Sequence, residues 1–595
     1  MIGIPLRFKT AVALVLLGLL TLLAGIGQKT FWAPAETVTA TASAGEAAPL
    51  TVIDQKLRTL EGGTVTINVK GEGSFLLAAG RPDDVDAWVG KTAHNTVTGL
   101  SDDKKSLQVK HTDGEASAPS PAGSDLWVST ENASGEMDYT WSAPADGDWS
   151  LLLAADGKKP APSSISMTFP NDTSMPWAVP LMVLGGLLIL AGGALLVLKP
   201  KGGAPRDGGS SGSGSASGGA TGKASDKQGS LFARRARAKA AAKAGERSSS
   251  ARLSVVVAAT TAAVLAGGAA AAQASTSSAP ASTASESAAP ATSAAAAPAG
   301  NGTPVVLDAQ FRRIMEQVAS ATDAGDAAKD AKKLAARVAG TELEVRTQNY
   351  KIRSRVASYD ARMPVRSTKL LTTVVTDKRE WPRSIMAVTQ GEGNVVPQLL
   401  TLVQSSPREN YKLVGTSPLQ PGTTFPAIVR GGTESLAADD KSGLLYSGQE
   451  ALAGLADRLT KSNSTFKSKL VEGESSPYIA DTLSYQADIV KDGVDGKFAF
   501  THKVVPESTV VFRTEDGGAL VLGRLTFNFD GTPKAEGDKL SIGNDAAVLA
   551  GGKETTTGMV LKFAESVAVY VPPAASKDPM KLVAATRGLV GASFK

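Results

Sequence analysis

Two uninterrupted apolar runs constrain this 595-residue chain more than any other feature of its sequence. They cover residues 10–27 and 176–198. A helix of roughly 20 apolar residues spans a hydrocarbon core about 30 Å thick, so both runs are predicted to be transmembrane helices. For the first run a cleaved signal peptide is the competing interpretation, because small residues follow it. Its length favours an anchor.

Basic residues around the two runs set the predicted orientation of the chain. Residues 199–252 hold twelve Lys and Arg against three acidic residues. Basic flanks stay in the cytoplasm, and tryptophan prefers the membrane interface. We therefore expect a cytoplasmic N-terminus at 1–9, an exported segment at 28–175 and a cytoplasmic, Gly/Ser-rich linker at 199–252. The residues expected to flank the membrane are Arg7, Lys9, Trp177, Lys199, Lys201, Arg234, Arg235, Arg237 and Arg252.

A weaker run at residues 253–273 decides on which side of the membrane the C-terminal half lies. It is uncharged but rich in alanine, so its insertion is only marginally favourable. The basic linker precedes it, and an Ala/Ser/Pro-rich segment at 274–302 follows, which is typical of an extended stalk. We predict a third transmembrane helix, with residues 274–595 outside. The alternatives are a cleaved signal, or a surface-lying or buried helix that leaves the C-terminal half in the cytosol.

Short segments of alternating polarity fill residues 45–170 and predict an exported antiparallel β-sandwich or jelly roll. One short helix is expected at 81–90, where a proline opens the first turn. The stretches "SFLLAAGRPDDVDAWVGKTAHNTVTGL" and "LWVSTENASGEMDYTWSAPADGDWSLLLAADG" resemble the extracytoplasmic β-domain of actinobacterial membrane proteins of unassigned function. That resemblance implies a sandwich ahead of a transmembrane helix, and it brings no catalytic residues.

Metal sites are not predicted in this domain. The chain has no cysteine, which excludes thiolate ligands and disulfides. Asp83, Asp84 and Asp86 lack the spacing of a calcium loop and are expected to be solvated turn residues. His94 and His111 are isolated in the sequence.

The C-terminal half alternates helical and strand patterns twice. Two helices are expected within 307–340, a strand at 341–354 followed by further strands, and a second helical stretch at 448–462 before a second set of strands. A short helix is expected to close the chain at 579–589. The repeated order predicts two related α+β halves. Their expected bounds are 303–432 and 433–595.

This order of elements is similar to that of the nuclear-transport-factor-2-like superfamily, whose members fold a twisted antiparallel sheet into a cone. The stretches "LLTTVVTDKREWPRSIMAVTQ" and "LVAATRGLVGAS" also resemble an uncharacterised actinobacterial family of membrane-tethered domains. These resemblances imply two cone-shaped halves. Binding by the concave sheet follows from fold analogy alone.

Catalytic motifs are not found in the sequence. It lacks a P-loop, GxGxxG, HExxH and GxSxG. His502 is the one histidine of the C-terminal half, and its strand setting favours a packing role. Nothing in the sequence pairs the aspartates that could hydrolyse glycans, which are Asp439, Asp440, Asp481, Asp488, Asp492 and Asp495. Tyr350, Trp381 and Tyr411 are candidate ligand contacts.

Together these observations predict a non-enzymatic, membrane-anchored extracytoplasmic binding or scaffold protein of the bacterial cell envelope, without a cofactor. Its expected partners are membrane lipid and either cell-wall glycan or another envelope protein, and not nucleic acid, because the basic run lacks interleaved aromatics. One alternative is an envelope glycan-acting enzyme. The other is a membrane sensor, which would lack an output domain of its own.

Overall fold

A computed structural model describes residues 6–42, 45–198, 304–473 and 475–595. The chain divides into two compact units. Among the described residues, the first comprises 6–33 and 175–198, and the second comprises 34–42, 45–174, 304–473 and 475–595. Several sequence predictions lie outside the described residues, namely the linker 199–252, the run 253–273, the stalk 274–302, Lys199, Lys201, Arg234, Arg235, Arg237 and Arg252.

The first unit contains two apolar helices, α1 (Leu6–Thr30) and α4 (Ala178–Val197). Within the described ranges, these two are long and apolar enough to cross a membrane, each with a mean hydropathy of 2.3. Only 22 % of the apolar window of α1 and 11 % of that of α4 are buried. The exposure of so many apolar side chains distinguishes both helices from the core helices of a globular domain.

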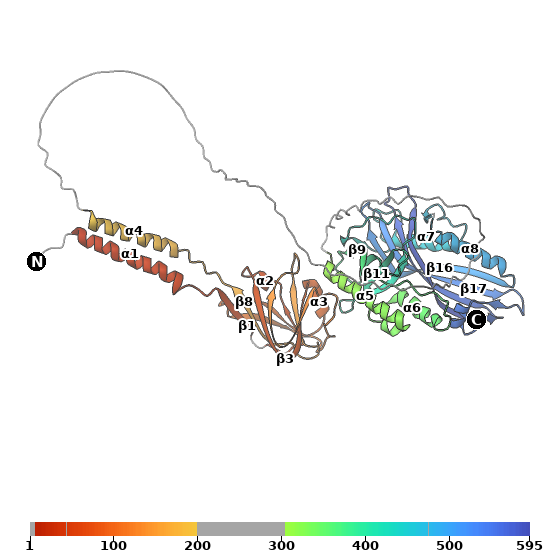
Figure 1. The fold of residues 1–595 in the computed structure, drawn as a ribbon, viewed down its shortest axis with the longest axis horizontal. Helices are drawn as coiled ribbons and strands as arrows, with labels where there is room; N and C mark the ends of the chain where they lie inside the picture. Colours follow the sequence, from red (N-terminus) through yellow and green to blue (C-terminus); the bar gives the residue numbers. More distant parts are fainter. Residues whose placement is uncertain (1–5, 43–44, 199–303, 474) are drawn as a thin grey trace, which may run out of the picture. The chain divides into compact units, whose positions relative to one another are not determined.

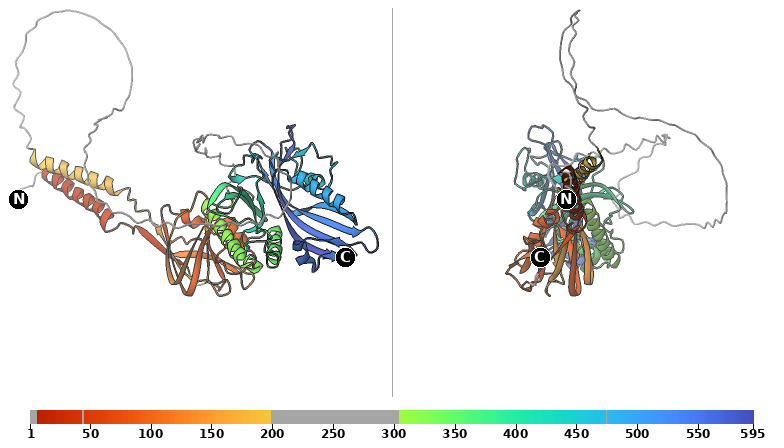
Figure 2. Two further views of the ribbon diagram at one scale, coloured as in Figure 1. Left: turned by 45° about the vertical axis from the view of Figure 1, so that its right-hand side comes forward. Right: turned by 90° about the vertical axis from the view of Figure 1, so that its left-hand side faces the viewer.

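The two helices lie side by side and antiparallel (Figures 1 and 2). Gly18 contacts Gly185, and a Cβ placed on Gly185 would lie 2.5 Å from the backbone nitrogen of Leu22. Seven residues further along α1, a Cβ on Gly25 would lie 2.8 Å from the carbonyl oxygen of Ala178. Small residues at this spacing let two backbones touch, as is common between transmembrane helices.

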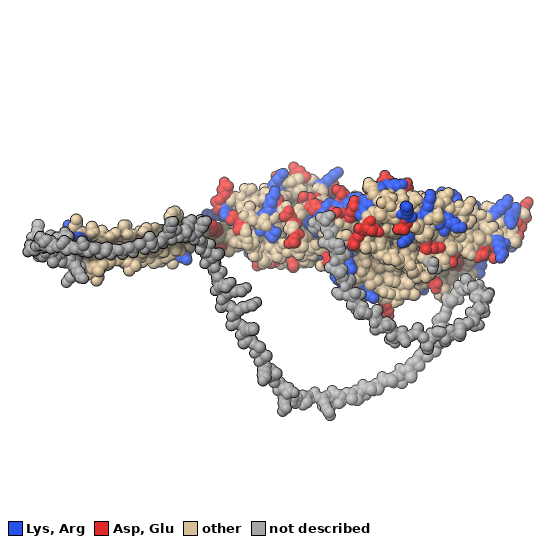
Figure 3. Space-filling view, turned by 90° about the horizontal axis from the view of Figure 1, so that it is seen from above, with Lys and Arg blue, Asp and Glu red and all other residues tan. Residues whose placement is uncertain are grey.

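The described flanking residues lie at the helix ends. Arg7 and Lys9 are exposed near the start of α1, and Trp177, just before α4, is 70 % exposed. On the face shown in Figure 3, the helices are almost free of charged side chains, whereas acidic and basic side chains intermingle over the folded domains. This distribution suits an apolar surrounding for the helices and an aqueous one for the domains.

Residues 34–174 form a sheet of eight strands in their described part, with the order β6-β3-β7-β2-β4-β5-β1-β8. The strands are β1 (Thr37–Ala42), β2 (Leu50–Ile53), β3 (Val65–Gly80), β4 (His94–Leu100), β5 (Ser106–Thr112), β6 (Ser129–Trp141), β7 (Ser150–Ala154) and β8 (Ser164–Pro170). β3 pairs with β8 through its first half and with β7 through its second half. The sheet therefore closes on itself as a barrel (Figure 1).

The predicted antiparallel sandwich or jelly roll is wrong in two respects. The strands form one closed sheet, and the pairs β1–β5 and β2–β4 are parallel. The barrel closes because β3 is one long strand with an irregularity between Lys70 and Ser74, where Gly73 has a φ of +77°. Alternation along a strand shows which side chains point inward, but it does not show which strand lies beside it.

The barrel interior and one outer face are both apolar. Ile67, Leu77 and Leu153 point into the interior cluster. On the outer face the helix α3 (Pro82–Val89) covers a second cluster, in which the rings of Trp88 and Trp127 lie 5.7 Å apart. The short helix α2 (Lys56–Thr59) lies between β2 and β3 in the chain. The helix predicted at 81–90 is confirmed.

The C-terminal domain starts with two helices and an antiparallel sheet of order β12-β11-β10-β9-β13. The elements are α5 (Asp308–Ala328), the 3₁₀ helix η1 (Ala331–Lys333), α6 (Gly340–Arg353), β9 (Lys369–Thr376), β10 (Arg383–Gln390), β11 (Gln398–Gln404), β12 (Lys412–Pro418) and β13 (Gly431–Thr433). Phe311 and Ile314 of α5 pack on Ile385 and Leu400 of the sheet. Only the short β13 runs parallel to its neighbour.

The same order of elements recurs in the second half, with the sheet order β14-β16-β17-β20-β21-β15. The elements are β14 (Ser435–Leu436), α7 (Gly448–Thr460), β15 (Leu470–Val471), α8 (Tyr478–Asp492), β16 (Gly496–Arg513), β17 (Ala519–Pro533), β18 (Leu540–Ser541), α9 (Asn544–Ala550), β19 (Glu554–Thr555), β20 (Met559–Val571) and β21 (Met580–Phe594). Leu452 and Leu455 of α7 pack on Val521 and Val569. Two helices followed by a four-stranded meander therefore occur twice, in agreement with two α+β halves.

The two sheets of the C-terminal domain pack face to face. Met386 and Val388 of the first sheet share an apolar cluster with Phe512 and Leu520 of the second. The chain passes from the first sheet to the second between β13 and β14. The sheet–sheet junction holds the cleft described below.

Three local predictions for this domain are wrong. The segment 341–354, expected as a strand, lies in the helix α6. The segment 579–589, expected as a helix, lies in β21, where pairing with β20 overrides the helix propensity of its Ala and Leu residues. Within 307–340, α5 continues unbroken through Ala328, and only η1 follows it before α6.

A buried ion pair joins the barrel to the C-terminal domain. The Arg337 Nη1 and Nη2 atoms lie 2.6 Å and 3.1 Å from the Asp125 Oδ2 and Oδ1 atoms. The two side chains are 8 % and 1 % exposed. The Tyr411 amide donates a further hydrogen bond of 2.8 Å to Asp125 Oδ2. Burial raises the pKa of Asp125, and the Arg337 guanidinium opposes that rise.

A second buried pair lies at the same interface. Arg383 Nη1 lies 2.6 Å from Asp84 Oδ1, and both side chains are almost fully buried. Arg408 donates hydrogen bonds of 2.8 Å to the carbonyl oxygens of Trp88 and Val89 at the end of α3. Asp84 is therefore not the solvated turn residue expected from the sequence, because its partner lies 299 positions away. Barrel and C-terminal domain form one packed body.

Candidate ligand-binding cleft

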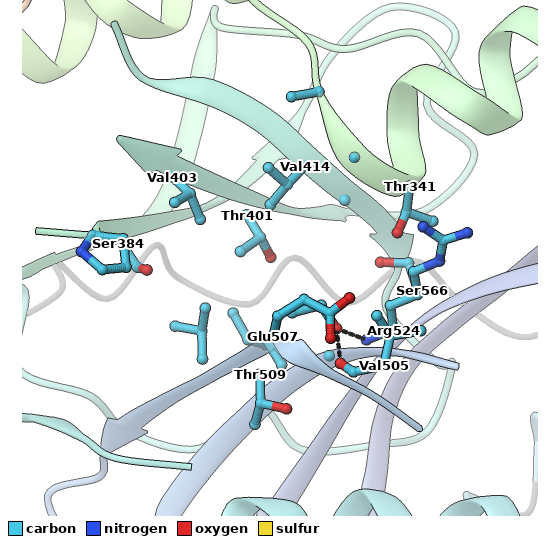
Figure 4. A pocket seen from close by; sticks show the side chains of 18 of the residues that line it. Thr341, Ser384, Thr401, Val403, Val414, Val505, Glu507, Thr509, Arg524 and Ser566 are labelled. Carbon is cyan, nitrogen blue, oxygen red and sulfur yellow. Dashed lines mark hydrogen bonds between the residues drawn. The ribbon is translucent and has the colours of Figure 1, made fainter. Parts of the chain in front are cut away.

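A cleft of about 380 Å³ opens between the two sheets of the C-terminal domain. The first sheet contributes residues of β10, β11 and β12, together with the turn before α6. The second contributes residues of β16, β17 and β20. Figure 4 shows Thr401 and Val403 on one side facing Glu507 and Thr509 on the other. The volume lies within the range of small-molecule sites.

A large bulge in β16 shapes one wall. Val505 pairs with Arg524 and Val510 pairs with Leu522, so four residues of β16 oppose a single residue of β17. Pro506, which has no amide hydrogen, lies within the bulge. The Ser508 hydroxyl replaces lost ladder bonds, because it donates to the Val505 carbonyl at 2.7 Å and accepts from the Arg524 amide at 2.9 Å.

Hydroxyl groups dominate the polar part of the lining. They belong to Thr341, Ser384, Thr401, Ser405, Ser508, Thr509 and Ser566. A hydroxyl group can both donate and accept a hydrogen bond. The sheets approach closely at one end of the cleft, where a Cβ placed on Gly415 would lie 2.7 Å from Ser566 Oγ.

The lining carries one carboxylate and one guanidinium. Glu507 is exposed, and Arg524 forms an ion pair with Glu344 of α6. The Arg524 Nε and Thr509 Oγ1 atoms are buried without a hydrogen-bond partner among the described residues. A buried polar atom without a partner is costly, so both atoms are suited to bind a ligand.

The usual glycoside hydrolase site has two carboxyl groups that flank the scissile bond, and the lining of this cleft contains one carboxylate, that of Glu507. Hydroxyls, one guanidinium and the apolar side chains of Val403, Val414 and Leu522 suit a polar ligand with both donor and acceptor groups.

A family model described as a domain of unknown function, DUF8094, matches residues 302–593. The match covers the whole C-terminal domain, including both walls of the cleft. No curated protein and no solved structure matches the chain.

The three aromatic residues proposed from the sequence do not line this cleft. Tyr350 is buried on α6 and donates a hydrogen bond to Asp326 Oδ1 at 2.5 Å. Tyr411 is fully buried. The Trp381 ring lies under the Arg383 guanidinium, 3.7 Å from ring centre to Cζ, and packs against the barrel. Trp381 therefore lies in the interface between the two domains, whereas the Tyr411 ring belongs to the core of the first half and only its amide bonds across the interface, to Asp125.

Three of the sequence-predicted aspartates come together at a different cavity, of about 510 Å³. Asp488, Asp492 and Asp495 lie around it, near the end of α8. Phe498 and Phe529 contribute to its wall, together with Lys539 and Ser541.

A buried polar network lies inside the second half. Glu565 is fully buried and accepts hydrogen bonds from Arg587 Nε at 2.8 Å and from the Tyr478 hydroxyl at 2.9 Å. His502 Nε2 lies 3.7 Å from Glu565, and its ring stacks on Phe527 with the ring centres 4.3 Å apart. Burial, with a smaller contribution from Arg587, lowers the pKa of His502 to about 3. His502 is therefore neutral near pH 7, and its ring packs against Phe527, in agreement with the predicted packing role.

We expect acid to destabilise the domain through His502. Its folded pKa of about 3 lies below the unfolded value of 6.5, so the unfolded state binds the proton more tightly. The part of the unfolding free energy that depends on neutral His502 is fully present above pH 6.5 and is lost as the pH falls toward 3. At pH 5 the loss amounts to about 2 kcal/mol. Chemical unfolding between pH 7 and 4 should show a flatter profile for His502→Gln than for the wild type. Equal slopes for the two proteins would contradict this assignment.

The cleft residues were missed by sequence analysis. Their types are common, and they come from six strands and a turn. One signal was available: Pro506 interrupts an otherwise continuous strand pattern, and a proline inside a strand marks a bulge or an edge.

Proposed function

We propose that the chain is a membrane-anchored binding protein of the bacterial cell envelope. Its barrel and C-terminal domain form one extracytoplasmic body, and the hydroxyl-lined cleft binds a saccharide of the cell wall. The observation that carries the binding role is the pair of buried atoms without partners, Thr509 Oγ1 and Arg524 Nε, which both lie in the cleft lining.

The buried interface supports a common location for both domains. The antiparallel pair α1 and α4 brackets the barrel in the chain, so both ends of the barrel segment emerge on one side of a membrane that these helices cross. The C-terminal domain packs on the barrel through Asp125–Arg337 and Asp84–Arg383, which supports a location on that same side. This proposal needs a further crossing of the membrane between α4 and α5. The uncharged run at 253–273 is the segment whose sequence suits that crossing.

The basic composition of the linker 199–252 supports a cytoplasmic location for the linker and therefore an exported location for both domains. The repeated helix–helix–meander order fits two cone-shaped halves of the nuclear-transport-factor-2-like type. Proteins that share one fold bind different ligands, so the proposed class of ligand is inferred from the residues that line the cleft and not from the fold.

The binding proposal predicts a specific loss of affinity. The test uses the full-length chain in detergent and soluble oligosaccharides released from the cell wall as the probe. Thr509→Val removes a hydroxyl at nearly constant volume and should weaken binding about tenfold, the cost of one buried hydrogen bond. Thr501→Val, on the same strand but outside the cleft lining, should leave the affinity unchanged.

Isothermal titration calorimetry measures both affinities. The proposal fails if no saccharide binds at millimolar concentration. It also fails if Thr509→Val and Thr501→Val bind equally well.

A further inference from the structure

Three potential metal ligands meet on the surface of the barrel. His111 lies near the end of β5, Asp113 follows that strand, and Glu46 lies in the loop before β2. One oxygen or nitrogen atom from each residue lies within 4.8 Å of the other two. No local sequence pattern indicates this group, because Glu46 is 65 positions from His111 and no other histidine lies close to His111 in the sequence.

A buried asparagine sets the orientation of the histidine ring. Asn95, on the neighbouring strand β4, is directly opposite His111 in the sheet and is 9 % exposed. Its Nδ2 donates to the Glu46 carbonyl oxygen at 2.8 Å, so its Oδ1 is the atom that faces His111 Nδ1, also at 2.8 Å. An amide oxygen only accepts, and His111 must therefore carry a hydrogen on Nδ1.

This tautomer aims the other ring nitrogen at the two carboxylates. His111 Nε2 lies 3.3 Å from Glu46 Oε2 and 3.4 Å from Asp113 Oδ1. With Nδ1 protonated, neutral His111 presents the Nε2 lone pair, so three electron-pair donors converge on one point. Such a group attracts a positive charge to its centre, and a metal ion is one such charge.

The distances match a tetrahedral ion. Zn–N and Zn–O bonds of about 2.0–2.2 Å place adjacent ligand atoms about 3.3–3.5 Å apart in a tetrahedron. The two distances from His111 Nε2 fall in that interval. A histidine whose second nitrogen donates to an amide or carboxylate oxygen is also the usual arrangement around protein-bound zinc.

We propose that Glu46, His111 and Asp113 bind a divalent transition-metal ion, with Zn²⁺ as the best match. Asn95 is a positioning residue that holds the ring and the Glu46 backbone. Glu46 and Asp113 are exposed, so the fourth position is open to water or to an external ligand. Imidazole favours Zn²⁺ over Ca²⁺ and Mg²⁺, which prefer oxygen ligands alone.

The composition of the chain makes the test clean. It has three histidines and no cysteine, and His502 is buried. His94 is the matched control, because it lies on β4 next to Asn95, is half-buried and hydrogen-bonds the Thr92 carbonyl oxygen at 2.8 Å. The full-length chain is purified in detergent with a histidine-free tag, stripped with EDTA and titrated with Zn²⁺ by calorimetry.

One Zn²⁺ per chain should bind the wild type and His94→Ala with equal affinity. His111→Ala should abolish saturable binding, and Asp113→Asn, which leaves the strand intact, should weaken it at least tenfold. Co²⁺ should bind the same site with the intense visible absorption of tetrahedral cobalt, and Ca²⁺ and Mg²⁺ should not compete with it. Absence of saturable Zn²⁺ binding, or equal binding by His111→Ala and His94→Ala, would overturn the proposal.

Discussion

A cysteine at position 593 is expected to react with a membrane-impermeant maleimide on intact cells, as strongly as a cysteine at position 120. A cysteine at position 213 should stay unlabelled until the cells are opened. The wild type has no cysteine, so Ser120→Cys, Ser213→Cys and Ser593→Cys each report one site without background. Ser120 and Ser593 are exposed in the structure.

The expectation follows from the interface between the domains. Position 120 lies in the barrel segment between α1 and α4, and position 593 lies at the end of β21. Two ion pairs bury their charges between these domains, and charges are buried in this way only when their partners are in place. We therefore expect the two domains to share one compartment, and we expect position 213, in the basic linker, to lie on the other side of the membrane.

Two outcomes would contradict this topology. Labelling at 120 with protection at 593 would show that the C-terminal domain lies in the cytosol, and the packing against the barrel would then not exist in cells. Protection at both positions would place both domains in the cytosol and reverse the orientation derived from the basic flanks. Labelling after lysis is the control that each cysteine is reactive.

Removing one member of the Asp125–Arg337 pair is expected to cost about 3–5 kcal/mol of unfolding free energy, because it leaves an uncompensated buried charge. Asp125→Ala also deprives the Tyr411 amide of its acceptor. Arg337→Ala should cost a similar amount. The double variant should lose clearly less than the sum, because it leaves neither charge unpaired.

The measurement is chemical unfolding of the full-length chain in detergent, followed by tryptophan fluorescence. Trp127 lies two positions from Asp125 and is buried, so it reports on the interface. The matched control is Asp83→Ala, which removes a partly exposed pair with Arg379 at 3.3 Å and should cost less than about 1 kcal/mol. If Asp125→Ala costs no more than Asp83→Ala, the buried pair does not hold the two domains together in solution.

Sequence reasoning failed at α6 for a physical reason. Its segment shows few apolar residues, and these suggested the alternation of a strand. The residues buried on α6 recur at helical spacing, but several are polar, including Glu342, Arg346 and Asn349. Arg346 is fully buried and pairs with Glu342 and Asp326 at 2.6 Å. A search for apolar periodicity misses a buried face that is made of ion pairs.

The sequence by itself determined the features that depend on local composition. The apolar helices α1 and α4, most strands and the repeated order of the C-terminal domain follow from runs of neighbouring residues, whose hydrophobicity and period act locally. Tertiary structure alone decided the rest. It paired Asp125 with Arg337, 212 positions apart, formed the cleft from two sheets, and brought Glu46 to His111. These sites depend on which distant residues folding brings within a few ångströms, and no local pattern encodes that choice.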